Sequence, residues 1–187
     1  ARTRHPRSAE AASNTVQGSE LLSDNAPRMT WGDVLSVLVI DHAVRTPGVG
    51  EQWWSQIERD HADISTEYGG VLETLDSGGG GAGFRTVLYP PRPTQRFSDD
   101  RFVASQDMLG HGARALAHYH FHAKDVPNRA YAGPGGGDMM YAATLGRACL
   151  VVTPIAPGVV NVDYYHAVAG PGGDEVRVDL GEVRAGE

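Results

Sequence analysis

The segment that decides the fold is RALAHYHFHAKD, residues 114–125. It holds three of the chain's eight histidines at alternate positions: His118, His120 and His122. In a β-strand successive side chains point to opposite faces, so residues two apart share a face. The residues between the histidines are the aromatic Tyr119 and Phe121, which suits a strand that lies against a core. Three neutral imidazoles on one face indicate a metal site, provided that a carboxylate from elsewhere completes the set.

Two carboxylates follow the histidine strand closely enough to complete such a site. Asp125 lies three residues past His122, where a loop must turn. Asp138 follows AGPGGG, residues 132–137, at the expected start of a helix, where the helix dipole stabilises a negative charge. Two histidines and one aspartate leave a fourth position open, as in catalytic zinc sites. Such a zinc ion lowers the pKa of a bound water to about 7 and polarises carbonyl groups.

A general base is the remaining requirement of this chemistry, and Glu67 is the candidate. It lies in STEYGGVL, residues 65–72, on an expected early strand. The two glycines after it allow another backbone to approach closely.

The elements expected around these residues give an α/β order with hairpins towards the C-terminus. Residues 1–29 are polar and aperiodic and predict an extended arm, which we expect to bind a partner subunit or a neighbouring copy. The domain then covers residues 30–187.

A capping box at Thr30 opens a helix whose apolar face we expect to include Val34, Leu35, Val37, Leu38 and Ile40. The further expected elements are a helix over 50–63, strands over 64–75 and 84–91 with the glycine run 78–81 between them, a helix over 98–109 ended by Gly110 and Gly112, the histidine strand, a helix from about Gly137 and strands over 149–155, 159–168 and 175–183.

Composition excludes several classes of function. The chain has 187 residues and a formal net charge of −7, and no basic stripe marks a nucleic-acid binder. No stretch approaches the roughly 20 apolar residues of a membrane-spanning helix. The single Cys149 excludes an internal disulfide and fits a reducing compartment such as the cytoplasm.

Residues 60–165 resemble the JAMM (JAB1/MPN) metalloproteases. The family pattern is a glutamate before a glycine-containing apolar strand, a His-x-His at the end of a central strand, and Ser-x-x-Asp at the start of the next helix. EYGGVL (67–72), HFH (120–122) and PGGGD (134–138) follow this order, and the apolar strand CLVVTPI (149–155) comes next.

The resemblance implies a fold, a metal and a reaction. The fold would be a mixed β-sheet flanked by helices, JAB1/MPN-like, with cytidine-deaminase-like layering. His120, His122 and Asp138 would bind Zn²⁺, and Glu67 would take a proton from the zinc-bound water. The substrate would be a peptide or isopeptide bond of a protein or peptide, often at the C-terminus of a ubiquitin-like modifier.

The chain departs from the family pattern at three places. Gly135 replaces the serine that helps to stabilise the oxyanion, and losing one such donor costs on the order of 10²–10³ in rate. Ala123 replaces a customary proline, and the loop between His122 and Asp138 is longer than usual. These departures keep a second hypothesis open, a non-catalytic MPN-like subunit of a larger assembly.

Other assignments of the same residues are also open. His118 could serve as a ligand in a shifted register, His118-x-His120, although we expect His118 and Gly135 to lie beside the metal ligands instead. A metal-dependent oxygenase is a third class, which would use a different carboxylate, Glu73 or Asp125, and bind iron.

Overall fold

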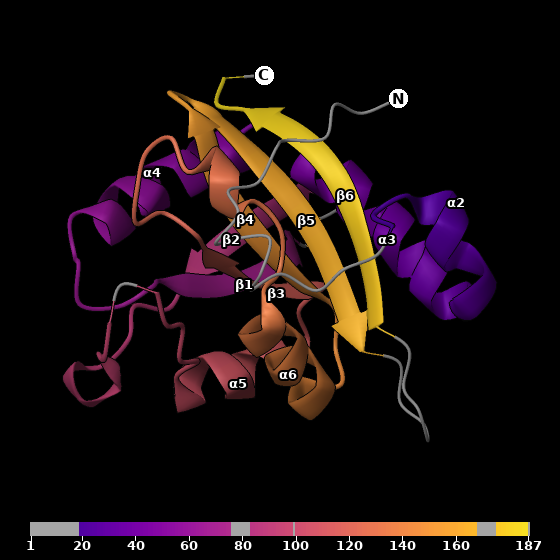
Figure 1. Cartoon of the computed structure of the whole chain (residues 1–187), viewed down its shortest axis with the longest axis horizontal. Helices are drawn as coiled ribbons and strands as arrows, with labels where there is room; N and C mark the ends of the chain where they lie inside the picture. The colour runs from indigo at the N-terminus through magenta and orange to yellow at the C-terminus, as the bar shows by residue number, and fades with distance from the viewer. Residues whose placement is uncertain (1–18, 76–82, 99, 168–174, 187) are drawn as a thin grey trace.

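The structure is a computed structural model that describes residues 19–75, 83–98, 100–167 and 175–186. Its centre is a six-stranded mixed sheet with the strand order β2-β1-β3-β4-β5-β6 (Figure 1). All its neighbouring strands are antiparallel except β3 and β4. The strands are β1 (Gly69–Leu75), β2 (Gly83–Leu88), β3 (Ala117–Phe121), β4 (Cys149–Ala156), β5 (Val159–Ala167) and β6 (Glu175–Arg184). The expected α/β class with a mixed sheet flanked by helices is confirmed.

Helices cover both faces of this sheet. The α-helices are α2 (Leu22–Asn25), α3 (Trp31–Val44), α4 (Val49–His61), α5 (Gln106–Gly112) and α6 (Gly136–Leu145), and short 3₁₀ turns are η1 (Ala26–Arg28), η2 (Pro93–Gln95) and η3 (Arg129–Tyr131). Helices α3 and α4 pack on one face, and α6 packs on the other, with α5 beside it (Figure 1).

The alternation of β3 divides its side chains between these two layers. Tyr119 and Phe121 are fully buried in the larger core under α3 and α4. The ring of Tyr119 meets that of Trp53 from α4 edge-on, with centroids 5.8 Å apart. His118 and His120 therefore point to the opposite face, which α6 covers.

The connection from β3 to β4 positions the candidate site. Parallel neighbouring strands need a crossover between them, and here α6 provides it. His120 is the partner of Val151 on β4 in this ladder. The start of α6 therefore lies near the end of β3, where His122 follows the strand.

The hairpin expected from the glycine-rich stretch is present. β1 and β2 pair antiparallel, from Gly70 opposite Leu88 to Leu75 opposite Gly83. The expected tip, Gly78 to Gly81, lies outside the described residues.

The capping box at Thr30 is confirmed, but the apolar face expected of its helix is only partly right. The Thr30 hydroxyl accepts from the Asp33 amide, and the Asp33 carboxylate accepts from the Thr30 amide. Val37 and Ile40 are buried, whereas Leu35 and Leu38 are 55% and 51% exposed. The helix carries apolar residues on both sides, and only one side can face the sheet.

Two other expectations are wrong in detail. The helix expected from residue 98 begins at Gln106, because the Ser105 hydroxyl caps it by accepting from the Met108 amide. The helix ends at Gly112, as expected, whereas Gly110 lies inside it.

Part of the expected extended arm is helical. Residues 22–28 form α2 and η1, and the Asn25 amide group donates to the Arg177 carbonyl of β6 at 2.8 Å. The side chain of Asn25 is 1% exposed. This short helical piece is therefore an integral part of the domain, and residues 1–18 lie outside the described part.

Among the described residues, no helix combines the length and apolarity that crossing a bilayer requires.

Candidate metal centre

The two histidines of the HFH motif face each other at the end of β3. Their Nε2 atoms lie 3.2 Å apart. His120 is 1% exposed, and the side chain of His122 is 16% exposed. One imidazole is therefore buried in the sheet, and the next one opens towards solvent.

Asp138 reaches both histidines from the first turn of α6. One carboxylate oxygen lies 3.0 Å from His120 Nε2, and the other lies 3.5 Å from His122 Nε2. The Gly135 amide donates to the second oxygen at 2.6 Å. This backbone hydrogen bond orients the carboxylate, and the helix start stabilises its charge.

Glu67 joins the group from the segment before β1, the strand that pairs with β3 on the side away from β4. It precedes β1 and pairs by an isolated parallel bridge with Phe102. Its side chain is buried, with 8% of the residue exposed. Ligand atoms of Glu67, His120 and His122 all lie within 4.8 Å of one another, close enough to hold a metal ion. The structure thus brings together all four residues that the sequence proposed: Glu67, His120, His122 and Asp138.

The outer nitrogen of His122 fixes the form of its ring. Nδ1 lies 2.9 Å from the Tyr131 carbonyl oxygen, which can only accept, so Nδ1 carries a proton. In the neutral ring Nε2 then has a free lone pair directed at His120 and Asp138. The Tyr165 hydroxyl contacts the outer nitrogen of His120 at 3.4 Å. Such outer partners are typical of metal-binding imidazoles.

The electrostatics of the group favour a positive charge at its centre. Burial raises the pKa of Glu67, although His122 and His120 offset part of the effect. Burial would also raise the pKa of Asp138, but attraction to His120 and hydrogen bonds from both histidines hold it well below its usual range. Burial would lower the pKa of His122, yet the hydrogen bond to Asp138 and the charge of Glu67 raise it to about 10. Without a metal ion, the raised pKa of His122 favours a positive charge beside Asp138.

Two aromatic rings, those of Phe102 and Tyr165, pack against the buried imidazole of His120. The sequence analysis did not predict these contacts. Phe102 stacks on His120 with ring centroids 5.1 Å apart and an interplanar angle of 14°. Tyr165 meets the same imidazole edge-on at 6.3 Å. In the sequence, Phe102 is an aromatic residue in the mostly polar stretch before α5. It was missed because this stretch was assigned to the helix expected over residues 98–109.

Asn128 is a second missed residue, from the loop between His122 and Asp138. Its side-chain amide donates to the His122 carbonyl at 2.9 Å, and its backbone amide donates to Pro154 at 2.7 Å. The longer loop is therefore tied to the end of β4, close to the ligand that it follows.

His118 does not take part in the cluster. Its Nδ1 lies 2.8 Å from the Tyr141 hydroxyl of α6, and its Nε2 lies against Gly112, where a β-carbon would overlap it. Burial and the nearby charge of Arg147 lower its pKa to about 4. The geometry does not support the shifted register His118-x-His120. Among the described residues, His118 is linked to the site through Tyr141, whose ring meets Phe102 edge-on at 5.7 Å.

The carboxylates of the oxygenase alternative lie elsewhere. Glu73 pairs with Arg85 at 2.5 Å and with His111 at 2.6 Å, and Asp125 is exposed. Within the described ranges, Glu67, His120 and His122 form a group of metal-ligand spacing, and neither Glu73 nor Asp125 belongs to it.

Comparison of the chain with protein-family models, with curated proteins and with solved structures gave no match in any of the three.

Proposed function

We propose that this chain is a zinc-dependent hydrolase that cleaves a peptide or isopeptide bond with water. One observation carries the proposal. Ligand atoms of Glu67, His120 and His122 lie within 4.8 Å of one another at the end of β3, and Asp138, from a third segment of the sequence, contacts both histidines. The reaction class is taken from the resemblance of the same motifs to the JAMM metalloproteases.

Zinc fits the donor set. Two nitrogens bound at 2.0–2.1 Å to one tetrahedral ion lie roughly 3.3 Å apart, and the two Nε2 atoms lie 3.2 Å apart. His120, His122 and Asp138 would hold the ion, since two imidazoles and one carboxylate are a common catalytic set. When bound, zinc would acidify a water molecule and polarise the scissile carbonyl.

Glu67 is suited to move the proton in this reaction. A buried carboxylate with a raised pKa is a stronger base than an exposed one, and it can keep the proton until a leaving group needs it. The water oxygen forms a bond to the carbonyl carbon, and the C–N bond breaks. The proton that Glu67 accepts from water passes to the leaving amine.

A non-catalytic structural subunit is the second candidate, and one observation favours it. At the start of α6, Gly135 offers no hydroxyl to an oxyanion, and its amide already donates to Asp138. Metal binding without hydrolysis is the outcome expected of this candidate.

The proposal is tested by hydrolysis of isopeptide-linked and C-terminally extended ubiquitin-like substrates by zinc-loaded protein. We expect cleavage that a chelator abolishes and added zinc restores, and that Glu67→Gln lacks. Cleavage that persists in Glu67→Gln would contradict the assigned role. Stoichiometric zinc without cleavage of any substrate would favour the structural subunit.

A further inference from the structure

The last turn of α4 contacts the two segments that carry the base and a metal ligand. The Asp60 carboxylate accepts the amide of Tyr68, the residue after Glu67, at 2.6 Å. The neighbouring His61 holds the carbonyl of Ala123, the residue after His122, through Nδ1 at 3.1 Å. Two consecutive helix residues thus fix the backbone next to both functional side chains.

Asp60 is a buried carboxylate at the C-terminal end of a helix. It is 2% exposed, and burying a carboxylate is costly unless it is well compensated. It also lies in the last turn of a helix, where the dipole disfavours negative charge. Acceptance of the Tyr68 amide is one of the contacts that stabilise this buried carboxylate.

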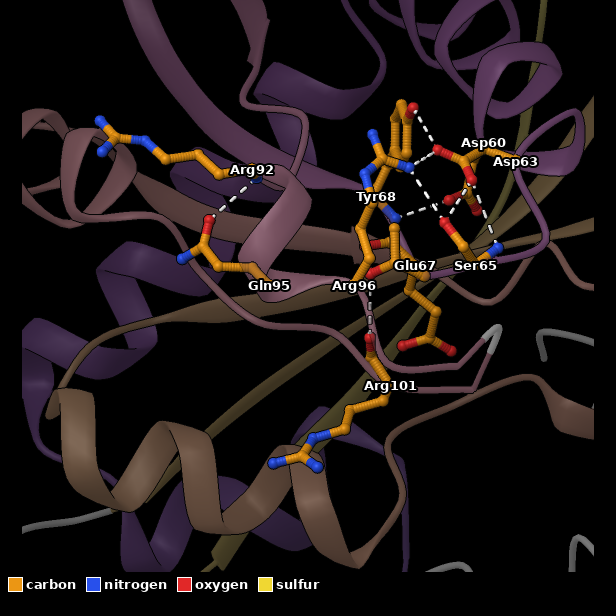
Figure 2. Close-up of polar contacts among 10 residues, drawn as sticks. Asp60, Asp63, Ser65, Glu67, Tyr68, Arg92, Gln95, Arg96 and Arg101 are labelled. Carbon is orange, nitrogen blue, oxygen red and sulfur yellow. Dashed lines mark hydrogen bonds and ion pairs between the residues drawn. The ribbon is translucent and has the colours of Figure 1, made fainter.

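Further polar contacts surround the segment before β1 (Figure 2). Asp63 accepts from the Tyr68 hydroxyl at 2.8 Å and from the Ser65 hydroxyl at 2.6 Å, and it forms an ion pair with Arg96. In Figure 2 the Glu67 side chain points away from this cluster. The cluster therefore holds the backbone and leaves the Glu67 carboxylate free to face the histidines.

We propose that Asp60 is a positioning residue for Glu67, which it holds through the Tyr68 amide at a fixed place relative to His120 and His122. His61 supports the opposite side through Ala123, so the end of α4 sets the separation of base and ligand. This inference rests on the proposed function for the role of Glu67. The hydrogen bonds from which it is argued lie within the protein and do not involve a metal ion.

The test compares Asp60→Ala with two controls. Asp60→Asn keeps an oxygen that can accept from Tyr68. Gln52→Ala removes another bond of the same kind from the same helix, because the Gln52 side-chain oxygen accepts the Thr86 amide of β2 at 2.8 Å. The rate of hydrolysis by zinc-loaded protein is measured for each variant alone and combined with Glu67→Gln, as double-mutant cycles.

We expect Asp60→Ala to lower the rate of hydrolysis roughly 10- to 100-fold, the range found when residues that orient a metal site are removed. In this background Glu67→Gln should add little, because the carboxylate has already left its position. Asp60→Asn should retain most of the rate, and Gln52→Ala should act independently of Glu67→Gln. Equal, additive effects of Asp60→Ala and Gln52→Ala would overturn the proposal.

Amide hydrogen exchange of the metal-free protein separates this inference from the proposed function. Asp60→Ala should speed exchange at Tyr68 much more than at Thr86, and Gln52→Ala should do the reverse. Unchanged exchange at Tyr68 would overturn the positioning role whether or not zinc binds. If the variants show this exchange pattern but the wild type binds no zinc, the hydrolase proposal would be rejected and the positioning role of Asp60 would stand.

Discussion

Gly69 and His120 are direct partners across the antiparallel pair of β1 and β3. The same register continued by two residues sets Glu67 opposite His122. The Phe121 amide donates to the Tyr68 carbonyl at 3.0 Å, which supports this continuation. The base and the solvent-facing ligand therefore lie at the same end of one strand pair, and the backbone hydrogen bonds of this pair act together with the end of α4 on their spacing.

Gly69 should tolerate no side chain. A β-carbon there would overlap the Phe102 ring and the Tyr119 carbonyl, and the carbonyl belongs to the sheet and cannot move away. We expect Gly69→Ala to lower the free energy of unfolding by about 1–3 kcal/mol, as measured by chemical denaturation. Gly110→Ala is the control, since open space surrounds that position and alanine favours a helix by up to about 1 kcal/mol. Equal stability of the two variants would contradict the close approach.

Glu67→Gln should separate metal binding from catalysis. The amide keeps the shape of the side chain but cannot accept a proton from water. We expect zinc to remain at its wild-type stoichiometry, with weaker affinity, and hydrolysis to fall by roughly 10²-fold or more. Metal analysis and kinetics on one preparation check both. Loss of zinc together with activity would instead make Glu67 a ligand.

Gly135→Ser should restore the hydroxyl that the family pattern has at this position. The backbone of Gly135, with φ −89° and ψ −179°, is open to any residue. We expect wild-type stability within a few tenths of a kcal/mol, since glycine and serine are both accepted at helix N-caps. Where the hydroxyl reaches the oxyanion, hydrolysis should rise by up to about 10²-fold. A stable, zinc-loaded variant with an unchanged rate would show that another donor already serves this purpose.

Glu73 should stabilise the fold in a pH-dependent way. Burial alone would raise its pKa, but hydrogen bonds from His111 and Arg85 outweigh burial and hold the pKa below its ordinary value of 4.5. A lowered folded-state pKa means that the stabilisation is present above the unfolded value. It is lost as the pH falls through the folded value.

We therefore expect Glu73→Gln to lower the free energy of unfolding at pH 7 by roughly 0.2–1 kcal/mol, as for partly exposed pairs. The difference from wild type should shrink at lower pH, in urea denaturation at pH 7 and pH 3. An equal difference at both pH values would contradict the ion-pair account. Zinc content should not change, because Glu73 lies outside the cluster.

Much of the fold could be predicted because its signals are local. The capping box at Thr30 and the alternation of His118 to His122 each fix an element without reference to the rest of the chain. The start of α6 at the PGGGD segment is local in the same way. The four residues of the cluster were found because each lies at the end of such an element.

What could not be predicted depends on tertiary contacts. Phe102 lies in an irregular segment because its backbone pairs with Glu67 and its ring stacks on His120, and no local pattern encodes that partner. The exposure of Leu35 and Leu38 follows from which side of α3 meets the sheet. His118 shares a face with the ligands, but Tyr141 and Gly112 engage it instead.

The central claim, one zinc ion held by His120, His122 and Asp138, is tested most directly by metal content. Protein purified without chelator or added metal is analysed by mass spectrometry. The His120→Ala/His122→Ala double variant is analysed beside it, with His111→Ala as a control at an exposed histidine. We expect about one zinc per chain, as in a mononuclear site, in the wild type and in His111→Ala, and none in the double variant. A folded wild type without metal, or zinc that persists in the double variant, would contradict the account.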